Sequence, residues 1–533
     1  MTPLFSIITP VWNPLSGDLE ACANSVLGQT NDAWEWVIVD DGSTNADVIR
    51  LLQRLSDDER VVTGRHEQNQ GITAATNTAI GRASGRFLAF LDHDDELTSD
   101  ALECMADAID RAPDVDFLYS DETKLDAHGN EYDWFAKPDW SLERLRSQNY
   151  CNHLSVFRRA LVDEIGGLRT GFDGAQDHDL TLRIAERTKQ IVHVPRVLYR
   201  WRASPGSTAA AADAKPAAST AGCAAVREHL ARSGVNADVV STVPGRYRAV
   251  RHLDRVPKVS VIIPTRGDAK RVHGRILNLV VNAVQSVVER STYPDIECVV
   301  VHDSTTAPTV LDALRELDPE IVLVEWSETF DFAKKTNLGV VRSSGDVLVL
   351  LNDDTEVISP DWVETIVGLL AEPDVGMVGP MLLLSDGRIQ SAGHHYAPTP
   401  FNLGNGAPAD DPGPHALFAV AGERSGVTAA CAGIRRSVFF QMGGLSEQFP
   451  NCYNDVDLGF KLLEADYRIV WTPHASLYHF ESLTRSTRES PQEARELDLR
   501  WGRRLGGDPF AKQLDLWWAQ VPFVRPSEAA DVT

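Results

Sequence analysis

The chain has 533 residues, enough for two or three domains that each bury a core. It is 43% hydrophobic and 24% charged, as in ordinary globular proteins, but its formal net charge is −25. That charge argues against a nucleic-acid-binding protein, whose surface should be basic, and against electrostatic adhesion to an anionic membrane. A phosphate-bearing ligand would therefore need a local metal ion or local Lys and Arg side chains.

Targeting signals and metal-binding cysteines are not evident in the sequence. The seven cysteines are scattered without a Cys-x-x-Cys pair, which indicates reduced thiols in a cytosolic protein and no structural zinc. The first residues lack the basic and apolar regions of a signal peptide, and no apolar run approaches the roughly 18 residues of a membrane span. We expect a cytoplasmic protein, peripheral at the inner face of the cell membrane at most.

The first hundred residues alternate between strands and helices. Residues 4–10, 35–39, 61–62 and 87–91 read as buried strands, and residues 19–27, 46–55 and 73–83 as helices. This alternation predicts a mostly parallel sheet with helices on both faces, and such sheets bind ligands at the carboxyl ends of their strands. A dinucleotide-binding oxidoreductase would need Gly-x-Gly-x-x-Gly after the first strand, where residues 9–14 are Thr-Pro-Val-Trp-Asn-Pro.

Three carboxylates end the strand at residues 87–91. Asp92, Asp94 and Asp95 lie close together in sequence and should repel one another, so we expect a cation beside them. Oxygen ligands suit Mg²⁺ or Mn²⁺, and such ions complete their shells with substrate phosphates. The alternative is a solvated acidic turn.

The acidic segment occurs twice. Residues 82–97 recur at 342–357 with a constant offset of 260, which indicates two domains of one type in tandem. The identical pairs are Thr76/Thr336, Asn77/Asn337, Arg82/Arg342, Ser84/Ser344, Gly85/Gly345, Asp94/Asp354 and Glu96/Glu356. Asp177 and Asp455 each open a helix further along, where an aspartate could also be only a helix cap.

The repeat and the composition divide the chain into four parts. We expect a first domain at residues 1–205, an Ala-rich and partly helical connector at 206–256, and a second domain at 257–485. Residues 486–533, rich in tryptophan, should form a helical tail that packs on the second domain.

Six motifs in the same order in each half resemble the family 2 glycosyltransferases. The first copy resembles polysaccharide-synthesising members, through Thr-Pro-Val-x-Asn, Val-Asp-Asp-Gly-Ser-Thr, Leu-Asp-His-Asp-Asp and Gly-Ala-Gln-Asp-x-Asp-Leu among others. The second resembles O-antigen and rhamnan-type transferases, through Ile-Ile-Pro-Thr-Arg, Leu-Asn-Asp-Asp-Thr-Glu-Val, Asn-Asp-Val-Asp-Leu and Leu-Tyr-His-x-Glu-Ser. The resemblance implies an α/β fold of two tandem glycosyltransferase A-type domains, Rossmann-like with mostly parallel sheets.

The same resemblance implies an activity. The expected reaction is inverting, metal-dependent transfer of sugars from UDP- or dTDP-sugars to a glycan or lipid-linked saccharide, as part of a growing bacterial surface glycan. Mn²⁺ or Mg²⁺ would neutralise the departing diphosphate. The two copies would then perform two different transfers.

Residue roles follow from the resemblance, position by position. It assigns the metal to Asp92, Asp94, Asp354 and His479, the general base to Asp177 and Asp455, and nucleotide contacts to Pro10, Asp41, Pro264, Asp303 and Asp353. Asn352 stands where the first copy has Asp92, and Asp353 is a possible substitute for it there. Arg200 stands where we expect the counterpart of His479; since arginine cannot ligate a metal, it would give positive charge to the diphosphate. Lys137 would act similarly, unless it is a surface lysine.

Two alternatives stay open. One copy, more readily the first because of Arg200, could be a non-catalytic module that binds acceptor or partner, in a single-site transferase. A non-enzymatic sugar-binding protein would not need both metal carboxylates and a base. The sequence does not identify the sugar, the linkage or the acceptor.

Overall fold

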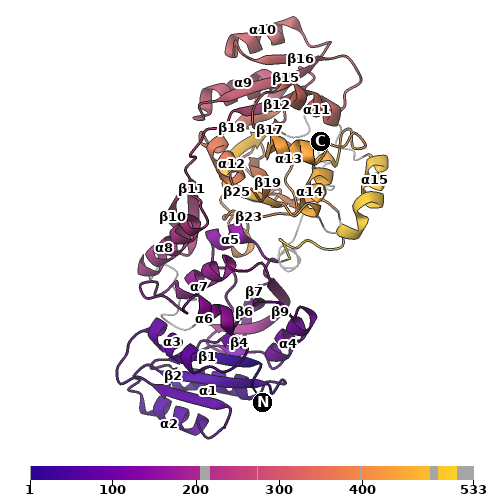
Figure 1. Ribbon diagram of the computed structural model, residues 1–533. Coiled ribbons are helices and arrows are strands. Elements are labelled where there is room, and N and C mark those ends of the chain that lie inside the picture. Colours follow the sequence, from indigo (N-terminus) through magenta and orange to yellow (C-terminus); the bar gives the residue numbers. More distant parts are fainter. Residues whose placement is uncertain (1, 204–215, 273, 397–398, 481–489, 513–533) are drawn as a thin grey trace. The chain divides into compact units, whose positions relative to one another are not determined.

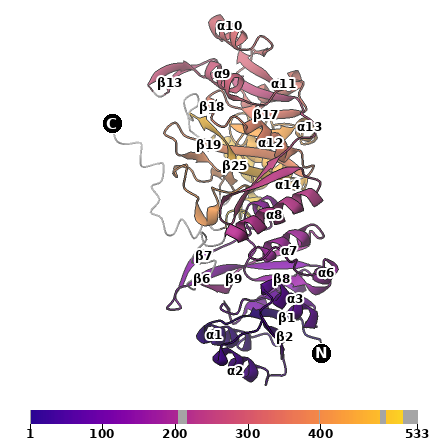
Figure 2. The same ribbon diagram turned by 90° about the vertical axis from the view of Figure 1, so that its left-hand side faces the viewer.

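The computed structural model describes residues 2–203, 216–272, 274–396, 399–480 and 490–512. Contacts divide the chain into two units, with Met1–Ala249 in unit 1 and Val250–Ala511 in unit 2. Figures 1 and 2 show both units, each built around a twisted sheet with helices on its faces. Along the described parts of the chain, no helix combines the length and apolar character needed to cross a membrane.

Unit 1 contains a mixed sheet with the strand order β3-β2-β1-β4-β8-β6-β9-β5, and β7 beside β6. The strands are β1 (Phe5–Val11), β2 (Trp34–Asp40), β3 (Val61–Arg65), β4 (Phe87–Phe90), β5 (Glu96–Leu97), β6 (Phe117–Leu125), β7 (Glu131–Phe135), β8 (Ser155–Arg158) and β9 (Ile191–Arg202). Strands β1 to β4 are parallel to one another, whereas β8 and β5 run antiparallel to their neighbours. The parallel half confirms the predicted fold class.

Helices cover both faces of this sheet because its central strands are apolar on both sides. The helices are α1 (Ser16–Leu27), α2 (Ala46–Leu55), α3 (Ile72–Arg82), α4 (Ala101–Arg111), α5 (Leu142–Ser147), α6 (Arg159–Glu164) and α7 (Gln176–Ala185). Phe5 and Ile7 pack with α1, α2 and α4, whereas Ile8 packs with α3 and α7 on the other face. Successive strand residues thus enter two separate cores.

Unit 2 repeats this topology. Its sheet has the order β16-β15-β12-β17-β24-β19-β25-β18, with β20 on β19 and β23 on β25. The strands in that order are Val322–Trp326, Ile296–Asp303, Val259–Thr265, Val347–Leu351, Cys431–Arg435, Val375–Leu383, Arg468–His479 and Thr355–Val357, with β20 at Ile389–Ser391 and β23 at Gly422–Glu423. Pro10 pairs with Val39 and Pro264 with Val301, so Asp41 and Asp303, each two residues further along, occupy equivalent places at the ends of β2 and β15. The two halves are one fold in two copies.

Other elements of unit 2 cover its sheet or extend from it. The helices are α9 (Leu279–Arg290), α10 (Pro308–Leu317), α11 (Phe332–Arg342), α12 (Trp362–Leu370), α13 (Arg436–Gln441) and α14 (Asn454–Glu464), and the hairpins are β13 (Ala269–Val272) with β14 (Arg275–Asn278) and β21 (His394–His395) with β22 (Phe401–Asn402). Helix α15 (Pro491–Trp501) lies on α14, where Leu497 and Trp501 join Phe460 in a small core. In the expected tail, the helix Pro491–Trp501 packs on α14 of the second unit; Trp517, Trp518 and Phe523 lie outside the described residues.

From residue 216 to residue 249, the segment predicted as a connector is part of unit 1. Helix α8 (Pro216–Arg232) and the hairpin of β10 (Ala237–Val243) and β11 (Arg246–Arg251) follow residue 215. Ala225, Val226, Leu230 and Val239 are buried in the same core as α7. The segment therefore supports the helix that carries the candidate base of the first copy.

A hydrogen-bonded buttress explains two of the identical pairs. In unit 1 the hydroxyl of Ser6 donates to Glu35 (2.6 Å) and accepts from the backbone N–H of Gly85 (2.8 Å), while Ser84 donates twice to Glu35. A Cβ on Gly85 would lie 2.6 Å from the Ser6 hydroxyl, so only glycine fits. Unit 2 repeats the set with Ser260, Glu297, Ser344 and Gly345. The buttress fixes the turn that starts the acidic strand.

The repeated asparagine ties a helix to a turn. Asn77 on α3 donates to the carbonyl of Leu168 and accepts from its N–H, both at 2.9 Å. Asn337 makes the same two bonds with Leu445, at 2.9 and 3.0 Å. Each Gly-Gly-Leu turn is thereby fixed ahead of the helix that bears the candidate base.

Candidate active sites

In the first copy, one of the carboxylates expected to bind the metal lines the same cavity as the candidate base. The cavity has a volume of about 70 Å³ and opens at the carboxyl ends of β1 and β4. Its lining includes Pro10, Asp92, Asn152, His153, Asp177 and Tyr199. Asp92 follows β4, Asp177 lies in the first turn of α7, and Tyr199 comes from β9.

The three carboxylates after β4 in the first copy differ in their hydrogen bonds. Asp95 is buried and accepts hydrogen bonds from the Tyr199 hydroxyl (2.6 Å) and the Arg202 N–H (2.7 Å). Burial, followed by the charges of Asp92 and Asp94, raises its pKa well above the usual value. Burial also raises the pKa of Asp94. No side chain of the described residues donates a hydrogen bond to the carboxylates of Asp92 or Asp94, so this pair suits a divalent cation.

Three neighbouring residues hold the carboxylate of Asp41, the expected nucleotide contact. One oxygen is 2.6 Å from His66 Nδ1 and accepts from the Gln70 N–H (2.9 Å), and the other accepts from the Gly71 N–H (2.8 Å). A carboxylate can accept about four hydrogen bonds, so one position remains, on Oδ2. In the second copy, Lys335 on α11 donates to Asp303 (2.6 Å) and to the Thr265 carbonyl (2.6 Å).

The two candidate bases have matching environments. Asp177 accepts from the His178 N–H (2.8 Å) and from the amide of Asn152, and Asp455 accepts from the N–H groups of Val456 (2.9 Å) and Ala429 (3.0 Å). Burial raises the pKa of Asp177, which brings a carboxylate closer to the range useful for a general base. The backbone of the second copy therefore replaces the Asn152 side chain of the first.

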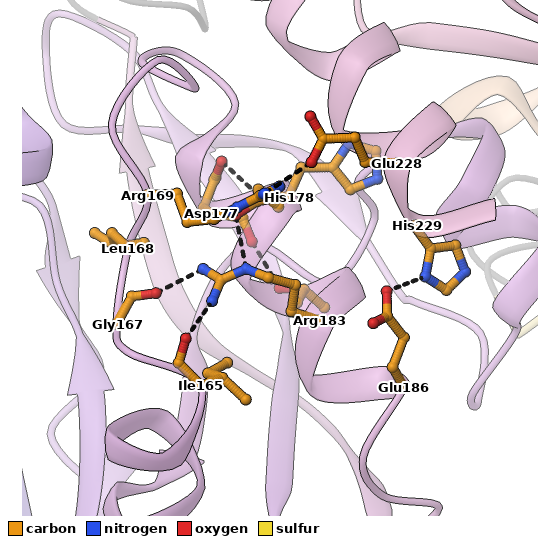
Figure 3. Close-up of polar contacts among 12 residues, drawn as sticks. Ile165, Gly167, Leu168, Arg169, Asp177, His178, Arg183, Glu186, Glu228 and His229 are labelled. Carbon is orange, nitrogen blue, oxygen red and sulfur yellow. Dashed lines mark hydrogen bonds and ion pairs between the residues drawn. The ribbon is translucent and has the colours of Figure 1, made fainter. Parts of the chain in front are cut away.

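Asp179, two residues after the candidate base, has a structural role. Its buried carboxylate forms ion pairs with Arg169 and with Arg183, the latter at 2.8 Å. Arg183 in turn donates to the carbonyls of Ile165 (3.0 Å) and Gly167 (2.6 Å), as Figure 3 shows. This clamp fixes α7 against the turn in front of it. In the second copy Lys461 pairs with Asp457 (2.8 Å) and donates to the Gly444 carbonyl (3.3 Å).

In the second copy, three side chains that could ligate a metal ion lie close together. His479 Nε2 lies 3.2 Å from Asp354 Oδ1 and 3.2 Å from the side-chain amide of Asn352. The buried Oδ1 of Asn352 has no hydrogen-bond partner among the described residues. An oxygen left without a partner beside a carboxylate and an imidazole fits a divalent ion. Asp353, the expected substitute, instead accepts from the Thr265 hydroxyl (2.6 Å).

The strand register corrects the expected equivalence of Arg200 and His479. Glu96 pairs with Arg200 and Glu356 with Tyr478, and His479 pairs with Thr355, one residue earlier. The counterpart of His479 is therefore Trp201. Because side chains alternate along a strand, Arg200 points away from the face of Tyr199 and forms an ion pair with Glu131 (2.7 Å).

Lys137 is not a surface lysine, because its side chain is completely buried. Its ammonium lies 3.3 Å from Glu122 and donates to the His153 carbonyl (2.6 Å). It does not line the cavity of the first copy. It is therefore not placed to contact a ligand in that cavity directly.

Sequence reasoning missed His153, Asn152, Tyr199 and Lys335. For Lys335 a signal existed, since the offset of 260 places it at Ala75, one turn into a helix that borders the site. His153 and Asn152 follow a helix in a stretch of mixed pattern and carried no motif. Their positions depend on the antiparallel strand β8, whose register the sequence does not fix.

Comparison with known proteins identifies the family. The family model described as "Glycosyl transferase family 2" matches residues 6–166 and 260–442, once in each unit. The chain belongs to glycosyl transferase family 2. The two matches cover both acidic strand ends, and each ends before the helix that carries the candidate base.

Relatives of this family 2 chain include much longer proteins. It is 39% identical over 95% of its length to "Uncharacterized protein y4gI" of Sinorhizobium fredii, and 36% identical over 92% to "O-antigen biosynthesis protein RfbC" of Myxococcus xanthus. It spans 57% and 38% of those two proteins. A third relative, "Chondroitin synthase" of Escherichia coli, is 31% identical over 37% of this chain and 28% of its own.

Proposed function

We propose that the chain is an inverting glycosyltransferase that moves sugars from nucleoside-diphosphate donors onto a growing bacterial surface glycan. The observation that carries this proposal is the cavity lined by both Asp92 and Asp177, a carboxylate suited to a divalent cation and a candidate base. The names of the relatives, an O-antigen biosynthesis protein and a chondroitin synthase, support the glycan acceptor.

The residues of the first site divide the reaction between them. Asp177 accepts the proton of the acceptor hydroxyl as that oxygen attacks the anomeric carbon from the face opposite the diphosphate. The new carbon–oxygen bond forms as the bond to the diphosphate breaks, and the nucleoside diphosphate leaves with the electron pair. When bound, Mn²⁺ or Mg²⁺ on Asp92 and Asp94 neutralises charge on the diphosphate. In the second site Asp354, His479 and Asn352 would hold the ion.

The base of the nucleotide is read by a strand-end carboxylate. The remaining acceptor position on Asp41 suits the N3–H of uracil or thymine, which cytosine and adenine lack. Pro10 lies near the end of β1, the strand beside β2, and Pro264 lies near the end of β12, the strand beside β15. Both prolines are therefore close to the ends of the strands that lead to Asp41 and Asp303. We therefore propose UDP- or dTDP-sugars as donors for both sites.

Two different transfers are the version of this function that the geometry favours. The sites differ in the residue opposite the acidic turn, Trp201 against His479, and in the group that holds the base, Asn152 against the backbone of Ala429. A site duplicated only for speed would have little reason to differ there. The alternative is a single-site enzyme whose first unit binds acceptor or partner.

The test is product analysis with short acceptors and single-site variants of the full chain. Asp94→Asn should remove one half-reaction and Asp354→Asn the other, so neither variant extends a polymer. Asp110→Asn, on the exposed side of α4, is the matched control and should leave both reactions intact. An unchanged product spectrum for Asp94→Asn would make the first unit a scaffold. An absence of transfer from any UDP- or dTDP-sugar by the parent protein would overturn the function itself.

A further inference from the structure

His153 belongs to the first site. It lines the same cavity as Asp92 and Asp177, the candidate metal ligand and the candidate base. Its ring packs against two aromatic side chains, with its centroid 4.7 Å from that of Tyr199 in a stacked arrangement and 5.3 Å from that of Trp201 in a tilted one. The ring therefore has a fixed orientation.

A buried ion pair, Glu122 with Lys137, contacts His153, and neither of its residues lines the cavity. Its Nδ1 is 3.2 Å from Glu122, whose carboxylate also pairs with the buried Lys137, and Lys137 donates to the His153 carbonyl. Burial would raise the pKa of Glu122, but the charges of Lys137 and His153 hold it at about 2. Glu122 is thus an ionised acceptor and Nδ1 carries a proton, while Nε2 makes no hydrogen bond within the described residues.

Electrostatics favours the doubly protonated ring. Burial would lower the pKa of His153, but its hydrogen bond to Glu122 and the charges of Glu122, Asp92 and Asp95 raise it to about 9. Lys137 balances the charge of Glu122, so the imidazolium contributes a net positive charge to the site. In a chain of net charge −25, such a charge matters for an anionic ligand.

The second copy has its histidine on another strand. Counting back from the paired residues of β8 and β24 places Ala430 at the position of His153. The register of β9 and β25 places Trp201 at the position of His479. The first site thus has His153 and the second has His479, at positions that do not correspond. The ring of His153 packs against Trp201, the residue that stands at the position of His479.

We propose that His153 binds the diphosphate of the nucleotide-sugar in the first site, with Nε2–H donating to a diphosphate oxygen. This inference rests on the proposed function and goes beyond it by giving the first site a cationic donor of its own. A role as metal ligand fits less well. Within the described ranges, no three His, Cys, Asp or Glu side chains gather around a possible metal position, so His153 does not share one with Asp92 and Asp94.

The experiment compares nucleotide affinities by calorimetry in the full chain. All proteins carry Asp354→Asn to weaken the second site, and the probes are UDP, dTDP and uridine with Mn²⁺, and Mn²⁺ alone. His153→Gln should weaken UDP or dTDP binding by about tenfold or more, the value of one charge-assisted hydrogen bond, and leave uridine and Mn²⁺ binding within about threefold. His128→Asn, in an exposed turn, is the control.

Each outcome decides the proposal. Equal losses for UDP and uridine would show a merely structural role, and a tenfold loss of Mn²⁺ affinity would make His153 a metal ligand; both overturn it. Binding of UDP by the parent without any effect of His153→Gln overturns it as well and leaves the proposed function standing. No binding of UDP or dTDP by the Asp354→Asn parent overturns it, and no binding by the unmodified chain overturns the proposed function as well. If His153→Gln does not fold, as judged by circular dichroism, His153→Asn takes its place.

Discussion

Two aspartates that are two residues apart should respond in opposite ways to the same substitution. Asp179 is completely buried between Arg169 and Arg183, and the Arg183 side chain is itself only 9% exposed. Removal of one partner of a buried ion pair costs about 3–5 kcal/mol because it leaves a buried charge uncompensated. Asparagine keeps one acceptor oxygen, so we expect Asp179→Asn to lower the free energy of unfolding by about 3 kcal/mol.

Asp177 should show the reverse pattern. Its carboxylate accepts from two neutral donors, His178 N–H and the Asn152 amide, and asparagine can accept from at least one of them. Asp177→Asn should therefore change the free energy of unfolding by less than about 0.5 kcal/mol. As the loss of a general base, it should lower turnover at the first site by about 10²–10⁴-fold with little change in donor affinity.

Urea denaturation followed by circular dichroism, together with single-site turnover, tests both expectations. Asp163→Asn, in an exposed ion pair with Arg159, is the control and should change neither quantity. The reasoning would be refuted if Asp179→Asn were as stable as the parent, or if Asp177→Asn kept more than a tenth of its turnover. In the latter case the buried Asp179 could not take over as base, since both of its oxygens are paired with arginines.

Three further predictions concern the metal, the second site and pH. EDTA should abolish transfer at both sites and Mn²⁺ or Mg²⁺ should restore it; full activity in chelator would contradict the metal assignment. Asn352→Asp, which gives the second site the charge of the first, should tighten Mn²⁺ binding there about tenfold by calorimetry, and unchanged affinity would remove Asn352 from the donor set. Burial lowers the pKa of His178 to about 4, below the value of about 6.5 expected when unfolded, so its contribution to stability is complete above pH 6.5 and lost as the pH falls toward 4. Between these pH values the free energy of unfolding should fall by about 1.4 kcal/mol more per pH unit in the parent than in His178→Gln, and equal slopes would contradict this.

The sequence predicted the features that depend on local pattern. The offset of 260 predicted the duplication, and the strand order of the two sheets confirms it. Buried strands and their helices were placed within a few residues because apolar runs and turn residues mark them. Asp92 and Asp177, 85 positions apart, were assigned by motif and lie on one cavity.

What the sequence could not provide was register and side-chain direction. A shift of one residue in the pairing of β5 with β9 decides whether Arg200 or Trp201 faces the site, and nothing in residues 191–202 fixes that shift. Similarly, Lys137 looked exposed because its partner Glu122 is 15 residues away on β6, across a hairpin. Pairing between strands, rather than the composition of either strand, determines these contacts.

The repeated buttress has a consequence for protein engineering. Ser6, Glu35 and Gly85 recur as Ser260, Glu297 and Gly345 with the same hydrogen bonds. The strands that end in the acidic turns, β4 and β17, therefore begin in the same way in both units. A chimera that exchanges the chain between the acidic turn and the base helix of the two units would join identical supports at one end. Such exchanges would test whether the segment between the acidic turn and the base helix determines which sugar each unit transfers.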